Sequence, residues 1–97
     1  MSNTLLSLQI IPSPPNNDDV IPYVDRAIAR IAATGVKYRV GPLETTMQGE
    51  LSELLEVVRK VNDEMVSMGC PSVISQVKIY HNTSGASMNG LTEKYDH

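Results

Sequence analysis

The chain has 97 residues, enough for one domain over residues 1–97, and its apolar fraction of 41% is ordinary for a globular protein. It contains no Phe and no Trp, so its core is expected to consist of Leu, Ile, Val, Ala and Met. A net charge of −3 with scattered basic residues argues against nucleic acid as a partner, because such binding depends on clustered Lys and Arg.

A first strand is predicted at Thr4–Ile11, where Leu6, Leu8 and Ile10 share one face because strand side chains alternate. The opposite face mixes apolar and polar side chains: Leu5, Ser7, Gln9 and Ile11. Such a face suits a sheet surface that is covered by another subunit or by a polar ligand. The strand is too short to cross a membrane and no basic cluster precedes it, so we expect no signal peptide, no membrane partner and a cytoplasmic location.

A loop is predicted at Pro12–Asn17 from its Pro and Asn content, and the first helix follows it. Asp18 or Asp19 is expected to accept hydrogen bonds from the first backbone N–H groups of this helix. Apolar residues then recur at helical spacing, at Val20, Val24, Ala27, Ile28 and Ile31. Since Gly35 suits the helix end, this helix is expected to cover one face of the sheet.

The segment Gly35–Glu50 is unusually rich in hydrogen-bonding side chains. Val36–Val40 has β-branched and aromatic residues and predicts a strand, which Gly41-Pro42 interrupts because proline cannot donate to a strand ladder. A short strand at Leu43–Gln48 follows, with four hydrogen-bonding side chains: Glu44, Thr45, Thr46 and Gln48. This density of donors and acceptors on a tight hairpin favours a small-molecule site.

The second helix is predicted from about Glu50 to Met68, and Gly69 is expected to end it. Its apolar stripe is Leu51, Leu54, Leu55, Val58, Val61 and Met65. Cys70 follows in a turn. As the single cysteine it cannot form an internal disulfide, so a small buried residue is expected there.

The last long strand is predicted at Val73–Tyr80. Val73, Ser75, Val77 and Ile79 form one face, and Ile74, Gln76, Lys78 and Tyr80 form the other. Asn82–Gly90 is expected to be a loop or a hairpin extension, and Leu91–His97 a short terminal helix that contains Tyr95.

The order β-α-β-β-α-β predicts an α+β, ferredoxin-like fold: a four-stranded antiparallel sheet with two helices on one face, and a short C-terminal helix. The other face of this sheet is expected to be polar. It would carry Ser7, Gln9, Gln76, Lys78 and Tyr80.

Several residues resemble the signature of the thiamine-binding, YkoF-like family of small ferredoxin-like proteins: Tyr38, Gly41-Pro42, Glu44-Thr45-Thr46 and Gln48-Gly49-Glu50. The resemblance extends over nearly the whole chain, including the Lys78-Ile79 strand end and the closing Lys94-Tyr95. It implies that two such sheets pack face to face and that dimers pair into a homotetramer. Gln48 stands where the family usually has an acid, which removes one negative charge.

The resemblance implies thiamine, or its aminopyrimidine moiety, as the ligand. Thr45, Thr46 and Gln48 are expected to read the pyrimidine edge, because hydroxyls and amides both donate and accept. Glu44 or Glu50 would face the cationic thiazolium, Tyr38 or Tyr80 would stack on a ring, and Ser7 and Gln9 would contribute from the neighbouring strand. The alternative for each residue is structural: threonines favour strands, Glu50 favours a helix N-terminus, and Gln48 hydrogen-bonds across a subunit interface.

The sequence has no metal-binding motif and no glycine-rich phosphate loop, so we expect no metal and no cofactor. The missing loop also favours free thiamine over thiamine diphosphate. The Tyr38–Glu50 segment with its resemblance and the mixed sheet face predict a non-enzymatic cytoplasmic binding protein that acts as a carrier, buffer or sensor. Two alternatives stay open: a small ferredoxin-like oligomeric enzyme that uses Glu44, Glu50 or His81, and an interaction or regulatory module with no small ligand.

Overall fold

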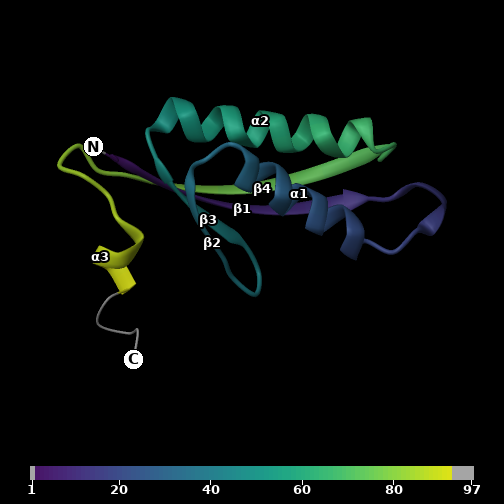
Figure 1. The fold of residues 1–97 in the computed structure, drawn as a ribbon, viewed down its shortest axis with the longest axis horizontal. Helices are drawn as coiled ribbons and strands as arrows, with labels where there is room; N and C mark the ends of the chain where they lie inside the picture. Colours follow the sequence, from purple (N-terminus) through teal and green to yellow (C-terminus); the bar gives the residue numbers. More distant parts are fainter. Residues whose placement is uncertain (1, 93–97) are drawn as a thin grey trace.

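The computed structural model describes residues 2–92. Its elements are β1 (Thr4–Ser13), a 3₁₀ turn (Pro15–Asn17), α1 (Ile21–Ala33), β2 (Lys37–Val40), β3 (Thr45–Gly49), α2 (Leu51–Ser67), β4 (Ser72–His81) and α3 (Met88–Thr92). The strands form one antiparallel sheet in the order β2-β3-β1-β4. This arrangement confirms the predicted α+β, ferredoxin-like fold with a short C-terminal helix (Figure 1).

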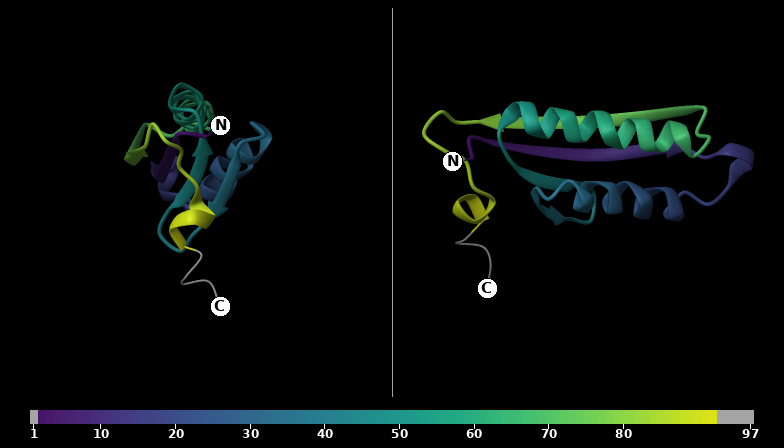
Figure 2. Two further views of the ribbon diagram at one scale, coloured as in Figure 1. Left: turned by 90° about the vertical axis from the view of Figure 1, so that its left-hand side faces the viewer. Right: turned by 45° about the horizontal axis from the view of Figure 1, so that its top comes forward.

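The sheet is covered unequally on its two sides. The long helices α1 and α2 lie over one face, whereas the short α3 lies on the opposite side, near one end of the sheet (Figure 2). Within residues 2–92, none of these helices combines the length and the hydropathy that crossing a bilayer requires. One face of the sheet therefore carries the two long helices, and the other is largely open (Figure 2).

The core forms between the sheet and the two long helices because β1 alternates with a period of two. Leu6 and Leu8 turn toward the helices and are at most 3% exposed, and Met47 of β3 is fully buried beside them. The helices add Ala27 and Ile31 from α1 and Leu54, Val57, Val61 and Met65 from α2. The predicted aliphatic core, without Phe or Trp, is confirmed.

The end of β1 differs from its predicted boundary. The strand continues past Ile11 to Ser13, because Pro12 and Ser13 pair with Val73 and Ser72 of β4. The loop predicted from Pro12 therefore begins two residues later. A proline is tolerated here because β1 has only one neighbouring strand beyond Leu8, so one of its edges needs no N–H donor.

The helix starts and ends follow local chemistry. Asp19 Oδ1 accepts a hydrogen bond from the backbone N–H of Ile21 at 3.1 Å, as predicted for an aspartate at this end. Gly35 has a φ of +82° directly after α1, a conformation that favours glycine, and Gly69 plays the same part after α2. Cys70 is buried, which confirms the prediction for the single thiol.

The apolar stripe of α2 was predicted with one wrong member. Leu55 is 46% exposed, whereas Val57, which the prediction omitted, is buried. The buried positions Leu54, Val57, Val61 and Met65 follow a spacing of three and four residues. Leu55 is rotated by about 100° around the helix from Leu54, which turns its side chain away from the buried stripe. A single exposed leucine is common on protein surfaces.

Ion pairs connect α1 to α2 and also form on the solvent side of α2. Glu64 of α2 accepts a hydrogen bond from Arg26 of α1 at 3.2 Å and lies 3.8 Å from Arg30. On the solvent side of α2, Arg59 pairs with Glu56 and Asp63, and its hydrogen bond lowers the pKa of the Glu56 carboxyl. The three arginines of the two long helices, Arg26, Arg30 and Arg59, therefore have carboxylate partners.

The C-terminal helix begins earlier than predicted. It was expected at Leu91–His97, but α3 starts at Met88, so the last residues of the predicted loop are helical. Tyr95, expected inside this helix, lies outside the described residues.

Two adjacent leucines test this packing. We expect Leu54→Ala to lower the free energy of unfolding by about 2–5 kcal/mol, because it empties a fully buried position. Leu55→Ala should cost only about 0.5 kcal/mol, since that side chain is half exposed. Urea denaturation followed by circular dichroism measures both. Equal losses would contradict the described orientation of α2.

Candidate functional site

The sheet face turned away from α1 and α2, here called the open face, is ordered in cross-strand rows. Residues paired across neighbouring strands point to the same side, so the register assigns each side chain. The first row is Lys37, Gln48, Leu5 and Tyr80; the second is Arg39, Thr46, Ser7 and Lys78; Gln9 and Gln76 form a third, and Ile11 and Ile74 follow beyond it. The open face is thus polar in its middle and apolar at its far end.

Five of the predicted ligand residues come together on the open face: Ser7, Gln9, Thr46, Gln48 and Tyr80. Neighbouring strands in a sheet lie about 4.8 Å apart, so the hydroxyls of Ser7 and Thr46, which are paired, are close neighbours. These side chains come from β1, β3 and β4, which are distant in sequence. The sheet therefore assembles a single polar strip from three strands.

Two predicted ligand residues lie on the other side of the sheet. Thr45 pairs with Leu8 and Tyr38 pairs with Met47, so both belong to the face that the helices cover. Thr45 is only 6% exposed. The hairpin was treated as one polar patch, but consecutive residues of a strand point to opposite faces, so Thr45 and Thr46 cannot read the same ligand edge.

The acidic candidates are dispersed. Glu44 lies in the turn before β3, and its backbone oxygen accepts a hydrogen bond from the Gly41 N–H at 2.8 Å. Glu50 lies just past the other end of β3. Six residues of extended chain separate them by roughly 20 Å. His81 is exposed at the end of β4, with Nδ1 2.9 Å from Thr4 Oγ1. Glu44, Glu50 and His81 therefore do not converge on one point.

The C-terminal segment closes one end of the open face. Gln48 Oε1 accepts a hydrogen bond from the backbone N–H of Met88 at 2.9 Å, and Arg39 Nη2 donates to Asn89 Oδ1 at 3.4 Å. Ala86 and Met88 are buried against Leu5 in a second, smaller apolar cluster. Sequence reasoning missed this cover. Its one signal was Leu5, an apolar side chain on a polar strip that needs something to bury it.

Side chains of the open face line three cavities. The first, of about 440 Å³, lies under the C-terminal segment and is lined by Ser2, Gln48, Tyr80, Gly85, Ala86, Ser87, Gly90 and Leu91. The second and third, of about 250 Å³ each, are lined by Leu5, Arg39, Thr46, Met88 and Leu91, and by Ser7, Gln9, Glu44, Gln76, Val77 and Lys78. The first is within the size range of small-molecule sites, roughly 300–1,000 Å³.

A further cavity of about 250 Å³ lies on the helix side. It is bounded by α1 and by the turn between β2 and β3, and it is lined mostly by apolar side chains, with Thr45 at one wall. Both Thr45 and Gln48 therefore border hollows, although on opposite faces of the sheet.

The chemistry of the open face suits a polar aromatic molecule. Ser7 and Thr46 offer hydroxyls that donate or accept, and the Gln48 amide can donate from its nitrogen while its oxygen is held by Met88. Asn82 Nδ2 donates to the Tyr80 hydroxyl at 3.0 Å, which orients an aromatic ring at the wall of the first cavity. Within the described part of the chain, no group of three His, Cys, Asp or Glu residues is placed to hold a metal ion.

Comparison with known proteins gives a consistent result. Residues 6–96 match the family described as Thiamine-binding protein. A UPF0045 protein of Clostridium perfringens is 41% identical over 95 residues, which cover 98% of this chain and 99% of that protein. A structure of a domain of unknown function, DUF77, from Bacillus cereus has 36% identity and a TM-score of 0.89, covering 99% of this chain and 93% of that one.

A second solved structure is that of a Thermotoga maritima protein whose suggested role is thiamine biosynthesis or salvage. It has 26% identity and a TM-score of 0.87, and the match covers 97% of this chain and 99% of that one. The similarity therefore extends over the whole fold in both structures.

The hydrogen bond between Gln48 and Met88 can be tested directly. Gln48→Leu removes the acceptor, so we expect the Met88 amide to lose protection from hydrogen exchange, equivalent to about 0.5–1.5 kcal/mol. Gln48→Glu keeps an acceptor oxygen and should keep the protection. Gln76→Leu, on the same face, is the matched control. Unchanged exchange in Gln48→Leu would show that Gln48 does not hold α3.

Proposed function

The chain belongs to the thiamine-binding protein family, and on this basis we propose that it is a non-enzymatic protein that binds thiamine or its aminopyrimidine moiety. It would act in the cytoplasm as a carrier, buffer or sensor. One observation carries the proposal: Ser7, Thr46, Gln48 and Tyr80 meet on the open face, beside a cavity of about 440 Å³ and a smaller one of about 250 Å³.

The aminopyrimidine matches the groups on this strip. Its ring nitrogens accept hydrogen bonds, which the Gln48 amide nitrogen and the hydroxyls of Ser7 and Thr46 can donate. Its exocyclic amine donates, and the same hydroxyls can accept. The Tyr80 ring offers a surface for stacking, and a cation–π contact with the thiazolium would contribute roughly 0.5–2 kcal/mol. Glu44, at the margin of the strip, would complement the positive charge.

The separate positions of Glu44, Glu50 and His81 fit a binding protein better than an enzyme. Catalysis by proton transfer needs an acid or base that is positioned at the reacting atoms. Glu44, Glu50 and His81 are exposed and lie at separate places. A pure interaction module would fill the surface beside Gln48 with side chains, whereas a cavity of about 440 Å³ is found there.

We further propose that the open face is completed by a second copy and that dimers pair into a homotetramer. Ile11 and Ile74, which pair at the far end of the open face, are 41% and 61% exposed. Together with the polar strip they form a surface that a second sheet would cover, so the ligand sites would lie near subunit interfaces.

Titration calorimetry with the two adjacent threonines tests the position of the site. We expect thiamine to bind with micromolar affinity and Thr46→Val to weaken it roughly tenfold, since a buried hydrogen bond to a ligand contributes about 1.4 kcal/mol. Thr45→Val changes the same residue type on the helix face and should leave binding unchanged. Absence of binding by thiamine and by its aminopyrimidine at millimolar concentration would refute the proposed function.

The assembly makes a separate prediction. Ile74→Asp should shift the protein to a smaller species in sedimentation velocity, because it places a charge in the surface that the second copy would cover. Ile21→Asp is the matched control, since Ile21 is equally exposed, at 61%, but lies at the start of α1. A wild-type monomer, or equal behaviour of both variants, would contradict the assembly.

A further inference from the structure

The basic residues of the open face point to the class of ligand. We propose that the site binds a phosphate monoester, such as a phosphorylated thiamine or aminopyrimidine, with the phosphate held between Arg39 and Lys78 over the hydroxyls of Thr46 and Ser7. This inference rests on the proposed function and names the chemical form of its ligand.

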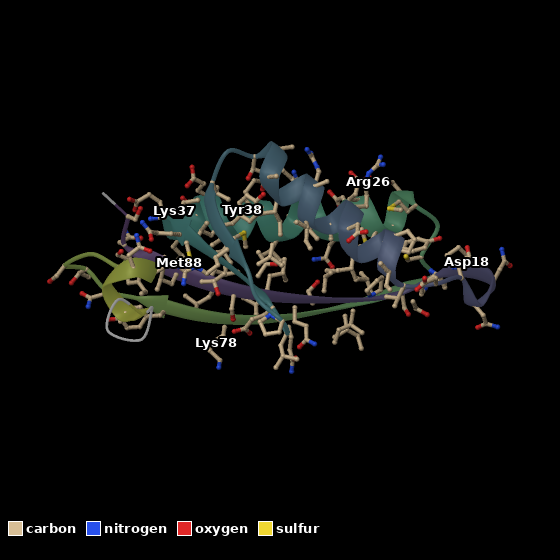
Figure 3. The ribbon with its side chains drawn as sticks, turned by 60° about the horizontal axis from the view of Figure 1, so that its bottom comes forward. Asp18, Arg26, Lys37, Tyr38, Lys78 and Met88 are labelled. Atoms are coloured by element: carbon tan, nitrogen blue, oxygen red, sulfur yellow. The ribbon has the colours of Figure 1, made fainter. Side chains whose placement is uncertain are left out.

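The first support is the cross-strand row itself. Arg39, Thr46, Ser7 and Lys78 occupy one continuous row across all four strands. With strands about 4.8 Å apart, two hydroxyls lie in the middle of the row and one long cationic side chain stands at each end. Each cation needs to reach across about one and a half strand spacings, roughly 7 Å, to contact a group bound midway over the hydroxyls. Figure 3 shows Lys78 projecting away from the helices.

The second support is the distribution of charge. The chain carries a net charge of −3, yet among residues 2–92 the cross-strand rows of the open face contain three cations, Lys37, Arg39 and Lys78, with the carboxylate of Glu44 at their margin. On the helices, Arg26, Arg30 and Arg59 are paired with carboxylates. Within residues 2–92, Lys78 has no such partner. Although the protein is acidic, basic side chains are concentrated on the open face, beside the two cavities of about 250 Å³ there.

The third support is the space above the row. One cavity of about 250 Å³ is lined by Ser7 and Lys78, and another of about 250 Å³ by Thr46 and Arg39. Each cavity thus contains one hydroxyl and one cation of the row. Charge-assisted hydrogen bonds of this kind are the strong ones in anion recognition, and arginine suits a phosphate because it donates two parallel hydrogen bonds.

Packing of two copies would strengthen the need for an anion. Face-to-face association would bring Lys78 of both copies together and remove them from water, which is costly for like charges. A bound phosphate would neutralise them. The missing glycine-rich loop favoured an unphosphorylated ligand, but here side chains, and not backbone N–H groups, supply the positive charge.

The position of Glu44 indicates which charges the ligand carries. Its carboxylate lines the same cavity as Lys78, so this part of the site presents both signs of charge. Thiamine monophosphate carries a cationic thiazolium and an anionic phosphate, and it fits such a site better than a molecule of one charge. A phosphorylated aminopyrimidine shares the phosphate but lacks the cation.

Calorimetric titration of the full-length protein with thiamine, thiamine monophosphate and the phosphorylated aminopyrimidine, at low and at moderate salt, tests the inference. We expect thiamine monophosphate to bind roughly tenfold more tightly than thiamine at low salt, and this preference to shrink as salt screens the charges. The phosphorylated aminopyrimidine distinguishes the two sources of the phosphate, and tighter binding of either phosphate ester than of thiamine supports the inference.

Two lysine variants make the test specific. Lys78→Gln should reduce the affinity for thiamine monophosphate roughly tenfold and leave the affinity for thiamine within about twofold, because an ion pair with the phosphate is lost. Lys60→Gln on α2 is the matched control and should change neither. Circular dichroism checks that both variants are folded, as expected for surface lysines.

The outcomes separate the two proposals. Thiamine binding with no gain from the phosphate, or an equal loss for both ligands in Lys78→Gln, overturns the phosphate site and leaves the thiamine-binding function intact. Failure of all three ligands to bind overturns the proposed function and the phosphate site with it.

Discussion

The pairing of β1 with two neighbours at once determines most of what this molecule presents. β1 lies between β3 and β4, and its register with each decides which side chains face the helices. Leu6 and Leu8 complete the core, while Ser7 and Gln9 join the polar strip. A shift of one residue would exchange these two sets, placing leucines in the strip and polar groups in the core. The aliphatic core and the candidate site are thus two consequences of one register.

The fold was predictable because its strongest sequence signals are periodic. Alternation along β1 and β4 placed Ser7, Gln9 and Tyr80 on one face, and the structure agrees. The same rule, applied to β3, would have separated Thr45 from Thr46, yet the hairpin was treated as a single patch of hydrogen-bonding groups. That error came from reading composition where the period of the strand decides direction.

The cover at the end of the open face was beyond local sequence signals. Ala86 and Met88 lie in a segment rich in Ser, Asn and Gly, which predicts a loop. Their burial depends on Leu5, more than 80 positions earlier, and on the Gln48 side chain that accepts from the Met88 N–H. Contacts of this kind depend on tertiary packing. The same applies to the grouping of Arg39 with Lys78, which are remote in sequence and share one cross-strand row only because the sheet brings β2 and β4 together with β3 and β1 between them.

Gln48 links structure and proposed function. Its oxygen accepts a hydrogen bond from the Met88 N–H at the start of α3, and its side chain lines the cavity of about 440 Å³, so one residue can fix the cover and contact a ligand at the same time. The glycine after it permits a direct passage from β3 into α2, because a Cβ there would lie 2.6 Å from Glu53 Oε1 and 3.3 Å from Leu54 Cδ2. The segment Gln48–Glu50 thus connects the site, its cover and the helix layer.

We propose that the ligand binds to the open face of the sheet and not to the helix face. Intermolecular nuclear Overhauser effects between the methyl protons of bound thiamine and the side-chain methyls of the protein test it most directly. Thr45 and Thr46 report the two faces from adjacent positions. The account predicts contacts to Thr46, Leu5 and Met88. Contacts to Thr45, Ile28 and Ile31, which border the cavity beside α1, would contradict it.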